Sequence, residues 1–212
     1  MSTSQLSRWS GLALIIGGLI LGIATVIHPD DANDPGAVTT SYWTMLHIVL
    51  LIGNVIAIPG LLGLYVHVAK RAGWLGLIGF LLNWLGILLF LPLFFFEAFV
   101  LPPIAADQAG VALLDPAGPL FSGALGVYFL AFAIIFAVGQ VLFGAALSRA
   151  SVPNRWVGWL FILVAPGPFV PPLPHIVLQA TGLALIITYV LCGYAVWRGQ
   201  ETEPAQSRLA AA

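Results

Sequence analysis

The chain has 212 residues, of which 60% are hydrophobic and only 7% carry a charge, and its net charge is −1 at neutral pH. A soluble domain carries about 25% charged residues, so this composition excludes a protein whose surface lies mostly in water. Without a basic cluster it also argues against nucleic acid as a partner, and the lipid bilayer is the expected environment.

Six apolar segments are expected to cross the membrane, over residues 8–28, 42–70, 73–100, 121–149, 155–170 and 175–198. A transmembrane helix needs about 20 apolar residues, so six crossings use most of the chain. We therefore expect an all-α membrane protein with a single domain over residues 1–198, built as a six-transmembrane-helix bundle. The polar segment 199–212 is expected to be a disordered cytoplasmic tail.

The basic residues predict the orientation of these spans. Each of them lies where an even number of crossings returns the chain to the same side: Arg8, Lys70, Arg71, Arg149, Arg155, Arg198 and Arg208. Basic residues resist translocation, so this side is expected to be the cytoplasm, with both termini inside and the first span uncleaved. The sequence therefore predicts a multi-pass protein of the bacterial cytoplasmic (inner) membrane.

The fifth span is expected to be short or broken by prolines. Residues 155–164 are apolar, but residues 165–174 read Ala-Pro-Gly-Pro-Phe-Val-Pro-Pro-Leu-Pro. Ten helical residues rise only about 15 Å, half of a hydrocarbon core of about 30 Å. Irregular backbone at that depth is tolerated where it is buried in protein or lines a cavity. The alternative is a simple kink with a loop just above the bilayer.

Ionisable side chains interrupt the apolar spans at similar heights. Counted from the basic residue at the inner end of each helix, His28 lies 20 residues away, His47 and His175 lie 23, and Glu97 lies 26. These counts correspond to about 30–39 Å of helix. Three histidines and one glutamate from four different helices are therefore expected in one layer near the outer surface, where such costly groups face protein or water.

The spacing of these residues predicts an outward-facing polar pocket. Trp43 and Asn54 share a helix face with His47, because they are four and seven residues from it, and His175 is four residues from Gln179. The candidate ligand-binding residues are His47, Glu97, His175, His28, Asn54, Gln179 and Trp43.

Several interpretations of this layer stay open. The leading hypothesis is a pocket for a small ligand, ion or proton in a transporter- or sensor-like protein, because histidine titrates near neutral pH. A metal site for zinc or iron, with His47, Glu97 and His175 as ligands, would instead indicate a membrane enzyme acting on a lipid or isoprenoid. The residues can also be interfacial groups that only cap helix ends.

A different class of function is an accessory subunit that packs against partner membrane proteins or forms a homo-oligomer. The sequence contains no nucleotide-binding loop, no Gly-x-Ser-x-Gly and no His-Glu-x-x-His motif, and no helix has a His-x-x-His or Glu-x-x-His pair. An enzyme is therefore not the leading hypothesis.

A further set of residues resembles a pattern found in small bacterial membrane proteins: His28-Pro29, Trp43, His47, Glu97 and Pro102. In these residues the chain is similar to the six-helix family called domain of unknown function 4386. The resemblance covers most of the membrane region and implies the six-helix architecture. It implies no established activity, so it adds to the expected fold and not to the function.

Overall fold

The computed structural model describes residues 3–115, 118, 120–164 and 174–199, and these residues form helices and turns without a β-strand. The elements are α1 (Thr3–Val26), η1 (Pro35–Thr39), α2 (Ser41–Phe95), η2 (Phe96–Val100), α3 (Leu101–Ala106), α4 (Gln108–Val111), η3 (Ala112–Leu114), α5 (Ala124–Ala150), α6 (Arg155–Val164) and α7 (His175–Arg198). The prediction of an all-α chain is confirmed for this part of the protein.

Four helical segments are long and apolar enough to cross a membrane, namely Ser4–Val26, Ser41–Ala106, Ala124–Ala150 and His175–Arg198. This identifies a multi-pass membrane protein. The second and third predicted spans both lie within the 66 residues of the second segment, which has a non-helical kink at Gly73. The count of six crossings therefore stays a prediction.

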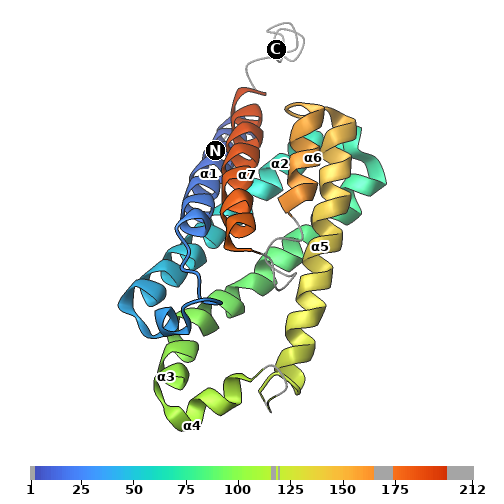
Figure 1. Cartoon of the computed structure of the whole chain (residues 1–212). Helices are drawn as coiled ribbons and strands as arrows, with labels where there is room; N and C mark the ends of the chain where they lie inside the picture. The colour runs from blue at the N-terminus through green and yellow to red at the C-terminus, as the bar shows by residue number, and fades with distance from the viewer. Residues whose placement is uncertain (1–2, 116–117, 119, 165–173, 200–212) are drawn as a thin grey trace, which may run out of the picture.

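A single glycine bends α2 where the sequence predicted an inner loop. Gly73 has φ 57° and ψ −154°, and it divides the helix into legs of residues 41–72 and 74–95 (Figure 1). This backbone conformation is essentially restricted to glycine, because a Cβ atom would clash with the neighbouring peptide. The chain thus changes direction at one residue, and helical hydrogen bonding resumes directly after it.

Helices α1 and α7 form a closely packed antiparallel pair, with the start of α1 beside the end of α7 (Figure 1). A Cβ atom added to Gly11 would lie 2.6 Å from the Gly193 carbonyl oxygen, and one added to Gly182 would lie 2.7 Å from the Gly22 carbonyl oxygen. Small residues of this kind let helix backbones approach each other within a membrane. The pair therefore brings both ends of the described chain to the same end of the molecule.

The second leg of α2 packs along α5 in a similar way. Phe143, which is fully buried, meets this leg at Gly79, and Gly139 on α5 meets it at Asn83. The Asn83 side-chain amide donates a hydrogen bond to the side-chain oxygen Oε1 of Gln140 between the two helices. This polar pair fixes the register of α5 against α2 deep within the apolar layer.

Helix α6 has ten residues and lies against α5 through Gly158, whose added Cβ would lie 2.5 Å from the Gly144 carbonyl oxygen. Ten residues rise about 15 Å, which is too short for a crossing. The proline-rich continuation at 165–173 and the tail at 200–212 lie outside the described residues. The predictions of a broken fifth span and of a disordered tail are therefore not tested.

Candidate functional site

A cavity of about 440 Å³ lies among α1, both legs of α2, α5 and α7. This volume is within the range of pockets that bind small molecules. Its described lining consists of Leu21, Thr25, His28, Asp31, Trp43, His47, Leu50, Asn54, Ile87, Phe90, Leu93, Phe94, Glu97, Phe129, Phe132, Phe136, Leu178, Thr181, Leu185 and Tyr189. Most of these side chains are apolar, and the histidines and carboxylates come from the segment after α1, the start of α2 and η2.

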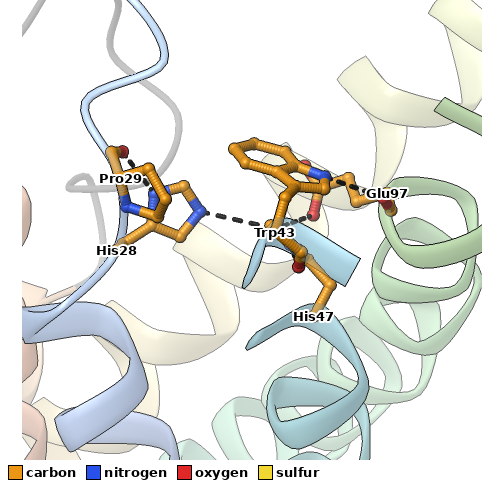
Figure 2. A network of polar contacts seen from close by, with 5 residues as sticks. All are labelled: His28, Pro29, Trp43, His47 and Glu97. Carbon is orange, nitrogen blue, oxygen red and sulfur yellow. Dashed lines mark hydrogen bonds and ion pairs between the residues drawn. The ribbon is translucent and has the colours of Figure 1, made fainter. Parts of the chain in front are cut away.

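Three ionisable side chains from separate parts of the chain meet in this cavity (Figure 2). The Nε2 atom of His47 lies 3.2 Å from Oε2 of Glu97 and 3.3 Å from Nε2 of His28. His47 is 1% exposed, whereas Glu97 and His28 are partly buried. His47 is thus the centre of a cluster that we call the His–His–Glu cluster (His28, His47 and Glu97).

Backbone hydrogen bonds fix the tautomers of both histidines. The Nδ1–H group of His47 donates to the Trp43 carbonyl oxygen at 2.8 Å, and the Nδ1–H group of His28 donates to the Pro29 carbonyl oxygen at 2.8 Å. Each neutral ring therefore has an unprotonated Nε2 atom. With Glu97 ionised, the three atoms that meet in the cluster are all hydrogen-bond acceptors, so at least one proton or an external donor must lie among them.

Glu97 is presented by a π-helical turn. It lies in η2, where the Leu101 backbone N–H donates to the Phe96 carbonyl oxygen, and Pro92 one turn earlier has no N–H to donate. The Trp43 indole N–H donates to the Glu97 carbonyl oxygen at 2.8 Å, which ties this turn to the start of α2 (Figure 2). Single π-turns of this kind occur frequently at functional sites.

Aromatic rings form the wall of the cavity next to the His–His–Glu cluster. The Phe90 ring centroid lies 5.1 Å from that of Phe132 and 5.0 Å from that of Phe136, both edge-to-face, and Phe90 stacks on Phe94 at 5.4 Å. Phe94 in turn lies 6.5 Å from the His47 ring. The cavity therefore joins an apolar aromatic region from α2 and α5 to a polar end.

The other predicted site residues have different positions. Asn54 lines the cavity, and its amide donates to the Ile87 carbonyl oxygen at 3.1 Å. His175 is not part of the described lining; its Nε2–H donates to the His28 carbonyl oxygen at 2.8 Å and so supports the backbone of the cluster. Gln179 also lies outside the described lining.

Several residues of the cavity were not among the predicted site residues. Asp31, Thr25, Thr181 and Tyr189 line it, as do the phenylalanines of α5. The spacing of Phe129, Phe132 and Phe136, three and four residues apart, indicates one helix face and is the signal that could have found this wall. Asp31 gave no such signal, because an acidic residue after a His-Pro pair is typical of an ordinary loop.

The charges that line the cavity are negative. Asp31 and Glu97 contribute carboxylates, no Lys or Arg occurs in the described lining, and residues 165–173 contain no charged side chain. Burial lowers the pKa of His28, which lies beyond the last residue of α1, and therefore favours its neutral form. Within the described residues no group of three or more His, Cys, Asp or Glu side chains is arranged to hold a metal ion.

No protein-family model, no curated protein and no solved structure matches this chain.

Proposed function

We propose that this protein binds a small molecule from the outer side of the membrane, in the manner of a transporter or a sensor. The observation that carries the proposal is the cavity of about 440 Å³ with the His–His–Glu cluster at its polar end. Ligand pockets are typically apolar, with a few convergent polar groups that orient the ligand. Ionisable groups within membrane helices are costly and usually serve such sites.

The proposed topology has six crossings, with the two legs of α2 as separate crossings and both termini in the cytoplasm. Arg8 lies near the start of α1, and the helix rises about 27 Å from it to Val26 before the chain reaches His28. Lys70 and Arg71 lie at the bend of α2, and His47 lies more than 20 residues before them. This supports an outer position for the cluster, because basic residues favour the cytoplasmic face.

A probe-binding measurement tests the function. The protein is placed in lipid nanodiscs and equilibrated with radiolabelled phenylbutylamine, phenylbutanol or phenylbutyrate, with empty nanodiscs as the background. We expect saturable binding of at least one of these probes, because each combines an aromatic body with a polar head. Absence of saturable binding of all three would contradict the proposal.

Two matched substitutions on α7 locate the binding. Thr181 lines the cavity and is 7% exposed, whereas Leu183, two residues later, is 55% exposed. Thr181→Phe fills the cavity and should abolish saturable binding, whereas Leu183→Phe should leave it unchanged. Thr25→Phe fills the same cavity from α1 and serves if Thr181→Phe does not fold. Equal binding by the filled variants and the control would place the probe elsewhere.

A further inference from the structure

We infer that the ligand of this cavity is an organic cation, a protonated amine attached to an aromatic or otherwise apolar body. This inference rests on the proposed function and assigns the chemical class of the ligand. Three features of the cavity carry it: the hydrogen-bonding character of its polar atoms, the sign of its charges and the aromatic rings beside them.

The polar groups of the cavity present acceptors. The Nε2 atoms of His28 and His47 are left as acceptors by the bonds of their Nδ1–H groups, and the Glu97 carboxylate donates nothing when ionised. The hydroxyl groups of Thr25 and Thr181 donate to the carbonyl oxygens one turn before them, at 2.8 and 2.9 Å. Their hydrogens are therefore not available to a ligand.

The amide of Asn54 is used in the same way, because it donates to Ile87 at 3.1 Å. Among the described polar residues of the lining, Tyr189 is the one whose donor forms no hydrogen bond. A ligand head that lies against the His–His–Glu cluster must therefore supply donors. An ammonium group has three N–H donors, and it can supply the donor that these neighbouring acceptors, 3.2 and 3.3 Å apart, require.

The charges select the same class of ligand. The described lining holds the carboxylates of Asp31 and Glu97 and no Lys or Arg. A cationic head is attracted to these groups, and the attraction is strong where water is excluded. An anionic head would be repelled, and it would meet acceptors where it needs donors. A neutral head gains hydrogen bonds but no charge interaction.

The aromatic rings beside the cluster favour an organic cation over a bare ion. The Trp43 ring lies tilted against that of His47, with ring centroids 4.2 Å apart, and Phe94 and Phe90 continue the aromatic wall inward. The faces of such rings attract cations and also pack against an apolar body. A small hydrated ion would leave this apolar region without a partner.

The three probes used above decide the inference, because they share one aromatic body and differ only in the head. At neutral pH phenylbutylamine is a cation, phenylbutanol is neutral and phenylbutyrate is an anion. We expect the amine to bind most tightly and the acid most weakly. Equal or tighter binding of the alcohol or the acid would overturn the inference while leaving the proposed function intact. Absence of binding of every probe would overturn both.

Matched charge-removing substitutions test the origin of this preference. Glu97→Gln should weaken binding of the amine by about tenfold to a hundredfold and change binding of the alcohol much less. Asp31→Asn should weaken binding of the amine by a smaller factor, because Asp31 is exposed. Asp34→Asn, on an exposed residue outside the lining, is the control and should change nothing. An unchanged amine-to-alcohol ratio in both Glu97→Gln and Asp31→Asn would overturn the inference.

Discussion

The Nδ1–H of His47 is bonded to the Trp43 carbonyl oxygen, so the Nε2 atom of the ring faces Glu97 and His28. A single backbone hydrogen bond thus determines what this side chain offers to a ligand. Trp43 has two further roles: its ring lies beside that of His47, and its indole N–H holds the π-turn of Glu97. The cluster therefore depends on a residue that does not itself titrate.

Replacing Trp43 by phenylalanine tests this dependence. Trp43→Phe keeps an aromatic ring but removes the donor to the Glu97 carbonyl oxygen, so we expect the free energy of unfolding to fall by about 1–3 kcal/mol and amine binding to weaken. Trp74→Phe, at a site that is 79% exposed, is the matched control and should change stability by less than about 0.5 kcal/mol. The free energy of unfolding of each variant is measured by denaturant unfolding in detergent. Equal decreases in both variants would contradict the role of the Trp43 indole in positioning Glu97.

The ionisation of His28 predicts a pH dependence of stability. Burial is the largest influence and lowers the pKa of His28 below its ordinary value of 6.5; the charge of His47 acts in the same direction, whereas the Pro29 carbonyl, Asp31 and Glu97 oppose it. A histidine whose pKa is lower in the folded state binds fewer protons when folded. Its contribution is therefore fully present above pH 6.5 and is lost as the pH falls through the folded-state pKa.

We therefore expect the thermal unfolding temperature to decrease between about pH 7 and about pH 5, and to decrease less in His28→Gln. The measurement is a series of thermal unfolding curves of both proteins in the same detergent. The same pH dependence in both proteins would show that His28 is not the responsible group.

At the scale of secondary structure, the bend of α2 is the feature on which the cavity depends. Its first leg carries His47 and its second leg leads to Glu97, so the two residues meet because the chain turns back between them. Gly73 makes this turn with a positive φ and without any atom within 4 Å of an added Cβ. Its requirement for glycine therefore comes from the local backbone conformation and not from packing against other parts of the structure.

Gly73→Ala should destabilise the protein by about 1–3 kcal/mol, the usual cost of a non-glycine residue in such a conformation. The matched control is Gly36→Ala in η1, where φ is not positive and an added Cβ would lie 3.3 Å from an Asp34 side-chain oxygen. We expect the control to keep the wild-type unfolding midpoint. A Gly73→Ala protein as stable as the control would show that the bend does not need glycine.

At the scale of the whole molecule, the orientation in the membrane decides which side supplies the ligand. Cysteine labelling can measure it, because the single native cysteine, Cys192, is buried and can be replaced by serine. In that background, Asp34→Cys and Asp107→Cys should react with a membrane-impermeant maleimide in intact cells. Asn154→Cys should react only after permeabilisation. All three positions are exposed in the structure.

This labelling also tests the number of crossings. If α2 crosses the membrane twice, residues 34 and 107 lie on the same side. If the long segment crossed once, they would lie on opposite sides, and only one of the two cysteines would react in intact cells. That result would contradict the six-crossing topology and the resemblance that implied it.

The candidate site was partly accessible to sequence reasoning. The helical rise placed His28, His47 and Glu97 at one height, because distance along a single helix follows from residue count. The same count placed His175 at this height, but in the structure the His175 side chain donates a hydrogen bond to the His28 backbone carbonyl oxygen. Height does not determine the direction in which a side chain points when the helices carrying it are connected by irregular segments.

The sequence by itself determined that this chain is helical and spans a membrane, because a continuous apolar segment of about 20 residues satisfies its own backbone hydrogen bonds in a bilayer by forming a helix. Only the tertiary structure decided which polar side chains meet. Contacts between residues 19 and 50 positions apart depend on the bend at Gly73, on the π-turn that presents Glu97 and on small-residue contacts between helices. These are interactions between distant segments, which no local pattern along the chain encodes.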